Sequence, residues 1–116
     1  MKIGNIKYAI KGMWICLKQE SNFRIHIAAA ILATIAGFYF EISKTEWLIQ
    51  TLCIGLIFFA EAVNTAIEEI VNKISPEWNT HAGKIKDIAS GAVLLISIFV
   101  LICGVIIYWN KVAALF

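Results

Sequence analysis

Three long apolar stretches constrain this chain more than any other feature of its sequence. They cover residues 25–40, residues 47–60 and beyond, and residues 88–109. A helix needs about 20 mostly apolar residues to cross a hydrocarbon core of about 30 Å, and the third stretch is long enough. The first two reach that length by including neighbouring residues or by crossing a locally thinner bilayer. We therefore expect three transmembrane helices.

The composition agrees with a membrane protein rather than a soluble one. Of the 116 residues, 60% are hydrophobic and 16% are charged, and the mean hydropathy is +0.80. This length allows one ordinary domain, and the chain is too apolar for a soluble one. The three cysteines lack a C-x-x-C spacing, so they predict buried apolar side chains and neither disulfides nor a metal site: Cys16, Cys53 and Cys103.

The first 22 residues predict an amphipathic helix on the membrane surface. Apolar residues recur at steps of three and four and form one stripe, while lysines gather on an adjoining face. Such a helix lies on the bilayer with its lysines toward anionic headgroups. Anchoring alone explains this pattern, and the alternative is that the lysines also meet a polyanionic substrate. The charged region before the first apolar stretch is too long for a cleaved signal peptide.

The basic residues orient the chain in the membrane. Most of them precede the first apolar stretch or lie between the second and third: Lys2, Lys7, Lys11, Lys18, Arg24, Lys73, Lys84 and Lys86. Only Lys44 lies between the first two stretches, and only Lys111 follows the third. The positive-inside rule therefore predicts that the N-terminus and the 72–87 connection are cytoplasmic and that the C-terminus is outside.

The two connections between the apolar stretches differ in kind. In 41-EISKTE-46, Ser43 followed three residues later by Glu46 matches a capping box, which predicts a tight hairpin with a helix starting just before Trp47. Residues 72–87 contain the single proline of the chain and predict a surface turn or loop.

Polar residues interrupt the second apolar stretch, in 58-FFAEAVNTAIEEIV-71. At about 100° per residue, a stripe within about 60° of Glu61 holds four more polar residues: Asn64, Thr65, Glu68 and Asn72. Glu69 points about 80° away from Glu61, outside that stripe. If the helix begins near residue 47, Glu61 lies inside the hydrocarbon, with Glu68 about 10.5 Å further along at the cytoplasmic interface.

A carboxylate inside the hydrocarbon is unfavourable unless it is neutralised, paired or placed in a polar cavity, which makes Glu61 a functional candidate. A protonated, helix-packing glutamate is the simpler alternative, and Asn64 alone fits an interhelical hydrogen bond. Glu20, Lys86 and Asp87 flank the predicted spans at the depth of Glu68. Charged residues collect at such ends in any membrane protein. Two carboxylates without soft ligands nevertheless suit Mg²⁺, with a lysine as phosphate partner.

Two motifs resemble the signature of the prokaryotic diacylglycerol kinase and undecaprenol kinase family. They are E-A-V-N-T-A-I-E at 61–68 and K-D-I-A-S-G-A-V-L at 86–94. Y-A-x-K-G at 8–12, N-F-R-I-H at 22–26 and E-W at 46–47 also fit, so the resemblance covers nearly the whole chain. It implies one all-α integral-membrane domain over residues 1–116, with an amphipathic helix at 1–22 and transmembrane helices at 23–40, 47–71 and 88–109.

The resemblance also implies an activity. Such a protein is a homotrimer in the bacterial inner membrane that uses ATP and Mg²⁺ to phosphorylate the hydroxyl of diacylglycerol or undecaprenol at the cytoplasmic face, with no nucleic-acid partner. Glu61 resembles the catalytic base, and Glu20 and Glu68 resemble the metal-binding carboxylates. The matching nucleotide-contacting positions are Tyr8, Glu77, Lys86 and Asp87, and the substrate-contacting set is Glu61, Asn64 and Ser90. Asn72 departs from the pattern, because the family commonly has Asp there.

Other functions stay open at this point. In a small proton- or cation-coupled transporter, Glu61 would be the ion site. In an accessory subunit without enzymatic activity, Glu61 would be dispensable. The charged residues at the interface favour the kinase, since a transporter does not need them together at one depth. Within the kinase function, the N-F-R-I-H and E-W features favour undecaprenol, but both lipids present one hydroxyl at the same depth.

Overall fold

The fold is a small bundle of helices in a computed structural model that describes residues 3–116. A short 3-10 helix η1 (Ile3–Asn5) precedes four α-helices, which are α1 (Ile6–Gln19), α2 (Ser21–Tyr39), α3 (Lys44–Ile74) and α4 (Thr80–Ala113). Helices α2, α3 and α4 are long and apolar enough to cross a membrane. The predicted all-α fold, one amphipathic helix followed by three candidate spans, is confirmed. Lys2, one of the N-terminal lysines, lies outside the described residues.

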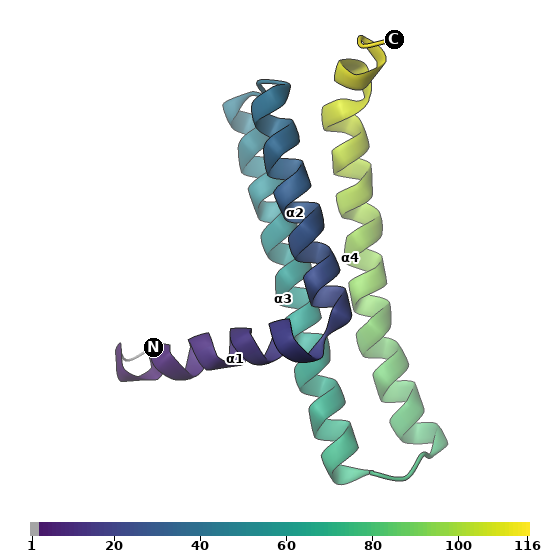
Figure 1. The fold of residues 1–116 in the computed structure, drawn as a ribbon. Helices are drawn as coiled ribbons and strands as arrows, with labels where there is room; N and C mark the ends of the chain where they lie inside the picture. Colours follow the sequence, from purple (N-terminus) through teal and green to yellow (C-terminus); the bar gives the residue numbers. More distant parts are fainter. Residues whose placement is uncertain (1–2) are drawn as a thin grey trace.

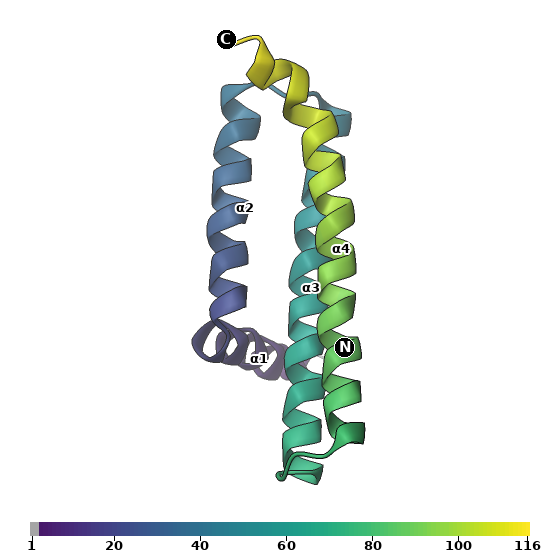
Figure 2. The same ribbon diagram turned by 90° about the vertical axis from the view of Figure 1, so that its right-hand side faces the viewer.

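Helix α3 is the centre of the bundle. It packs along α4 and along α2, whereas α2 and α4 do not approach each other closely. Helix α1 leaves the bundle at a steep angle near the middle of α3 (Figure 1). Turned by 90°, the bundle shows α2 standing apart from α4 (Figure 2). The α1 end of the bundle therefore carries the second half of α3 and the first half of α4.

The hairpin between α2 and α3 forms as the capping box predicts. The Glu46 N–H donates to Ser43 Oγ at 3.1 Å, and the Ser43 N–H donates to Glu46 Oε1 at 2.9 Å. Glu46 also pairs with Lys111 of α4, whose Nζ lies 3.0 Å from Oε2. Beside the hairpin, Gly37 packs so closely on Trp47 that an added Cβ would lie 2.5 Å from the indole ring. These contacts hold three helices together at the end opposite α1.

The connection between α3 and α4 is shorter than the expected loop at 72–87. Helix α3 continues to Ile74 and α4 starts at Thr80, so only residues 75–79 are non-helical. Pro76 prevents further helix because it follows directly on the C-cap residue. Asn79 starts α4, since its Oδ1 accepts a hydrogen bond from the Ala82 N–H at 2.8 Å. The two helices therefore extend well past the apolar stretches from which their spans were predicted.

One arginine ties α1 to α2. Arg24 Nη1 donates to the Leu17 and Lys18 carbonyl oxygens at 2.9 and 3.0 Å. The apolar stripe of η1 and α1 remains exposed in this chain, at Ile3, Ile6, Ile10 and Met13. This exposure agrees with a helix that rests on a bilayer surface.

Candidate functional site

The acid-bearing stripe of α3 faces the interior of the bundle at the α1 end. Glu61 is 2% exposed, Thr65 is 5% exposed and Asn64 is 8% exposed. Glu68, two turns further along the helix, is half-buried, whereas Glu69 and Asn72 are exposed. Periodicity therefore predicted correctly which of the polar residues at 61–69 turn inward, but it also placed Asn72 in the same stripe, and Asn72 is exposed.

His26 of α2 is the side chain that meets Glu61. Its Nε2 lies 3.3 Å from Glu61 Oε1, and the two side chains are 23% and 3% exposed. Sequence reasoning included His26 only as the last letter of the N-F-R-I-H motif and did not treat it as a site residue. The available signal was an ionisable side chain just inside the first apolar stretch, which is uncommon without a polar partner.

Asn64 presents an unused acceptor in this interior. Its Nδ2 donates to Glu68 Oε1 at 3.4 Å, but its buried Oδ1 has no hydrogen-bond partner among the described residues. An unsatisfied buried acceptor of this kind typically costs about 1–3 kcal/mol. A bound hydroxyl or cation at Oδ1 would remove that cost. Thr65, by contrast, is satisfied by donating to the Glu61 carbonyl oxygen at 3.0 Å.

Glu20, at the junction of α1 and α2, faces the acids of α3. Burial raises the pKa of its carboxyl, and the negative charges of Glu68, Glu61 and Glu69 raise it further. Within residues 3–116 the ion pairs are His26–Glu61 and Lys111–Glu46, so neither Glu20 nor Glu68 is paired with a cation. The site therefore carries an excess of negative charge that a bound cation would relieve.

The donor set fits one class of metal ion. No group of three or more His, Cys, Asp or Glu side chains capable of holding a metal is present in the described part of the chain. Mg²⁺ does not need such a group, because it commonly keeps several waters and binds one or two carboxylates together with substrate phosphates. Glu20, Glu68 and the free Asn64 oxygen are hard oxygen donors, so they fit Mg²⁺ and not a soft metal.

The other predicted residues lie outside this cluster. Tyr8 is 63% exposed on α1, with Lys7 Nζ 5.0 Å from its ring centroid. Glu77 lies in the 75–79 connection, and three residues lie on the first turns of α4: Lys86, Asp87 and Ser90. No side-chain hydrogen bond or ion pair within residues 3–116 joins any of them to the acids. One chain thus brings together the carboxylates but not the predicted nucleotide contacts.

An apolar cavity of about 740 Å³ lies beside the cluster, between α1, α2 and α3. Thr65 and Glu69 line it, together with apolar residues such as Met13, Phe23 and Phe58. This volume is in the range of small-molecule pockets, which combine an apolar wall with a few polar groups. The cavity can therefore receive an apolar molecule whose polar end reaches the acids.

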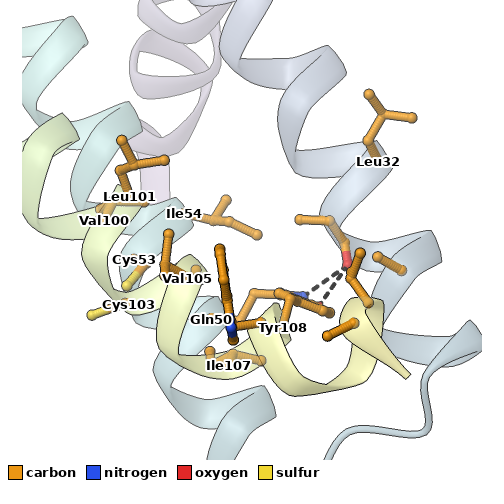
Figure 3. Close-up of a pocket in the computed structure, with 16 residues that line it drawn as sticks. Leu32, Gln50, Cys53, Ile54, Val100, Leu101, Cys103, Val105, Ile107 and Tyr108 are labelled. Carbon is orange, nitrogen blue, oxygen red and sulfur yellow. Dashed lines mark hydrogen bonds between the residues drawn. The ribbon is translucent and has the colours of Figure 1, made fainter. Parts of the chain in front are cut away.

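A second cavity, of about 660 Å³, lies toward the other end of the bundle. Its polar groups satisfy each other, as Figure 3 shows: Gln50 Nε2 donates to the Ala33 carbonyl oxygen at 3.1 Å, and the Tyr108 hydroxyl donates to Gln50 Oε1 at 2.6 Å. Its lining residues include no acid or base. We therefore assign the candidate site to the acid cluster and not to this cavity.

Known proteins resemble this chain along most of its length. The family model for prokaryotic diacylglycerol kinase matches residues 7–108. An undecaprenol kinase of Bacillus subtilis is 39% identical over 104 residues, 90% of this chain and 85% of the relative. A diacylglycerol kinase of Escherichia coli K12 is 28% identical, with 89% and 84% covered. A diacylglycerol kinase of Haemophilus influenzae is 27% identical, with 95% and 89% covered.

Proposed function

The chain belongs to the prokaryotic diacylglycerol kinase family, and we propose that it transfers the γ-phosphate of ATP to the hydroxyl of a membrane lipid at the cytoplasmic face. It is an ATP-dependent lipid kinase that works as a single domain. The main observation in support of this function is the burial of Glu61. This residue is only 2% exposed, although it lies on a candidate transmembrane helix, and further acids lie near it.

Glu61 is the general base in this proposal. Phosphoryl transfer depends mainly on positioning and on neutralising charge, and a positioned carboxylate can accept the proton of the attacking hydroxyl. Asn64 lies one turn away, and its free Oδ1 can accept a hydrogen bond from a lipid headgroup. Ser90 of α4 is the remaining substrate contact. The apolar cavity beside Thr65 receives the adjoining apolar part of the lipid.

Glu20 and Glu68 hold Mg²⁺ in this proposal. Their uncompensated charges support the assignment, because the pKa of Glu20 is raised by burial and then further by the other negative charges nearby. Mg²⁺ supplies neutralisation of the phosphate oxygens during transfer. These two carboxylates lie at the membrane interface, where a charged nucleotide can approach from water.

The nucleotide contacts are Tyr8, Glu77, Lys86 and Asp87, with Lys86 on the phosphates. The first half of α1, to which Tyr8 belongs, extends away from α3 and α4 in Figure 1, whereas Lys86 belongs to the first half of α4. A nucleotide that touches both helices together with the acids needs a second copy of the chain. We propose that this copy belongs to a homotrimer.

Undecaprenol is the acceptor that we favour. The relative named undecaprenol kinase is 39% identical, whereas the diacylglycerol kinases of Escherichia coli and Haemophilus influenzae are 28% and 27% identical. The N-F-R-I-H and E-W motifs also favour undecaprenol as the acceptor. The comparisons give no support to the transporter alternative.

The location follows from the charge distribution. Lysines gather on α1 and at the ends of α3 and α4 that border the 75–79 connection. We therefore propose a multi-pass protein of the bacterial inner membrane whose N-terminus and 75–79 connection face the cytoplasm.

The test is phosphorylation by the purified protein in mixed micelles with Mg²⁺ and ATP, with undecaprenol and diacylglycerol offered separately. We expect product with undecaprenol, at least tenfold less product with diacylglycerol, and none without ATP. Product with diacylglycerol alone would overturn the acceptor but leave the lipid kinase intact. No product with either lipid, in folded protein, would contradict the function.

A further inference from the structure

The carboxylate of Glu61 depends on one neighbour. Among the described residues, the polar side chain that contacts it is His26, through Nε2 at 3.3 Å from Oε1. The hydrogen bond from Thr65 goes to the backbone oxygen of Glu61 and leaves the carboxylate free. The contact joins α2 to α3, so it also fixes the position of the carboxylate between two helices.

Other charges near this pair do not stabilise an ionised Glu61. Glu20, at the α1–α2 junction, is a like charge and not a partner: burial raises the pKa of its own carboxyl, and the negative charges of Glu68 and Glu61 raise it further. Arg24 lies two residues before His26, but its guanidinium donates to the carbonyl oxygens at the end of α1. Helix α4 also packs along α3, but within residues 3–116 no ion pair joins its charged residues, among them Lys86 and Asp87, to Glu61. His26 is thus the donor available to this carboxylate within residues 3–116.

We propose that His26 is the positioning residue of the general base: an Nε2–H of its imidazole donates to Glu61 Oε1, which keeps the buried carboxylate ionised and leaves Oε2 free for the acceptor hydroxyl. Imidazole suits this role because it carries a donor in either protonation state and reaches across two helices. A histidine that fixes the orientation of an ionised carboxylate acts through that carboxylate and does not itself touch the substrate. The proposal rests on the role of Glu61 given above.

The reaction step balances without a proton from His26. The lipid hydroxyl oxygen forms a bond to the γ-phosphorus while the bond from that phosphorus to the β,γ-bridging oxygen breaks, and ADP leaves with the bonding electrons. The hydroxyl proton moves to Oε2 of Glu61 and is later released to water. The Nε2–H stays on His26 throughout.

Two substitutions separate this role from simple packing. His26→Leu keeps an apolar side chain but removes the donor, so the protonated, inactive form of Glu61 becomes favoured. We expect kcat near neutral pH to fall about 100-fold, KM for ATP to stay nearly unchanged, and the acid limb of the kcat profile to move to higher pH. His26→Gln keeps an N–H donor at a similar reach and should retain kcat within about tenfold of wild type.

His81→Leu is the matched control. His81 is the other of the two histidines in the chain, and it is exposed on the first turn of α4. Its substitution should leave kcat and the acid limb unchanged. Circular dichroism and thermal melting of each variant in detergent check that the helices form, and the His26→Gln result decides the question if His26→Leu does not fold.

An activity-independent readout is the carboxyl band of Glu61 in pH-difference infrared spectra, identified by its loss in Glu61→Gln. The proposal requires that protonation of Glu61 occurs at a higher pH in His26→Leu than in wild type or His26→Gln. Suppose that wild type phosphorylates lipid but that His26→Leu shifts neither the Glu61 carboxyl band nor the acid limb of the kcat profile. The proposed role of His26 is then wrong, and the lipid kinase function is unaffected. If wild type phosphorylates no lipid, the kinase fails, and the infrared shift alone decides whether His26 keeps Glu61 ionised.

Discussion

Glu61 combines charge with burial, two properties that oppose each other in most proteins. Its side chain is 3% exposed, and its ion-pair partner in the described chain is a histidine. Helical periodicity was enough to predict that Glu61, Asn64 and Glu68 share an inward face. Periodicity could not predict His26, because a contact between two helices depends on their register and crossing angle, and neither can be read from one sequence.

Glu20→Gln should stabilise the metal-free protein at neutral pH. A carboxyl whose pKa is raised on folding binds more protons in the folded than in the unfolded state, so its contribution is fully present below the unfolded pKa and is lost as pH rises through the folded pKa. The glutamine amide does not ionise, so the variant does not lose this stability as pH rises. We expect its free energy of unfolding to exceed that of wild type by less than about 1 kcal/mol at pH 7, since the group is partly exposed.

Thermal melts in EDTA at neutral and acidic pH measure this effect of Glu20→Gln. The gain in stability should disappear at low pH, where the Glu20 carboxyl of the wild-type protein is protonated in both the folded and the unfolded state. Glu41→Gln, exposed in the hairpin at the other end of the bundle, is the control and should change little. A destabilised Glu20→Gln at neutral pH would show that Glu20 does not face the acids of α3.

Glu68→Gln should raise the Mg²⁺ concentration needed for half-maximal activity by about tenfold or more and also lower the maximal rate. Loss of one carboxylate from a two-carboxylate site weakens a hard cation strongly. Magnesium titration of kinase activity measures it. Glu41→Gln is the control, because that side chain is exposed in the hairpin at the other end of the bundle, and equal effects of the two substitutions would argue against a specific metal ligand.

At the scale of elements, the hairpin was the part most completely predicted. Ser43 and Glu46 identified a capping box that the structure contains in full, because this motif is local. The far ends of α3 and α4 were not predicted. Polar residues there continue the helices beyond the apolar stretches, and hydropathy marks where a chain meets lipid, not where its helix ends.

Gly37→Ala should loosen the packing of α2 on α3. The added methyl would lie 2.5 Å from Trp47 Cη2, so the indole must move. Overpacking of this kind destabilises proteins by about 1–3 kcal/mol. Thermal melting in detergent measures the loss, and Gly55→Ala is the control because no atom lies within 4 Å of its added Cβ. Equal stability of Gly37→Ala and wild type would show that Trp47 repacks without cost.

At the scale of the molecule, a single chain supplies an incomplete site. It gathers Glu20, Glu61 and Glu68, but the first half of α1 extends away from α4 (Figure 1). The candidate spans also bury little surface within the chain. The proposed trimer comes from family resemblance alone, because the number of copies in an assembly leaves no periodic pattern in one chain.

The purified protein should have three times the chain mass of 12.9 kDa after subtraction of detergent. Light scattering coupled to size-exclusion chromatography measures this mass. The Glu61→Gln variant should assemble in the same way, since the amide is nearly isosteric with the carboxyl. A monomer with full kinase activity would contradict the proposal that a second copy completes the site.

The most direct test of the central claim compares wild type with Glu61→Gln in ATP-dependent phosphorylation of undecaprenol. General-base catalysis contributes about 10²–10⁴-fold, so we expect at least a hundredfold loss of kcat with an unchanged KM for ATP and intact helices and assembly. Wild-type turnover by a folded Glu61→Gln protein would contradict the account, because the buried carboxylate would then have no part in the chemistry.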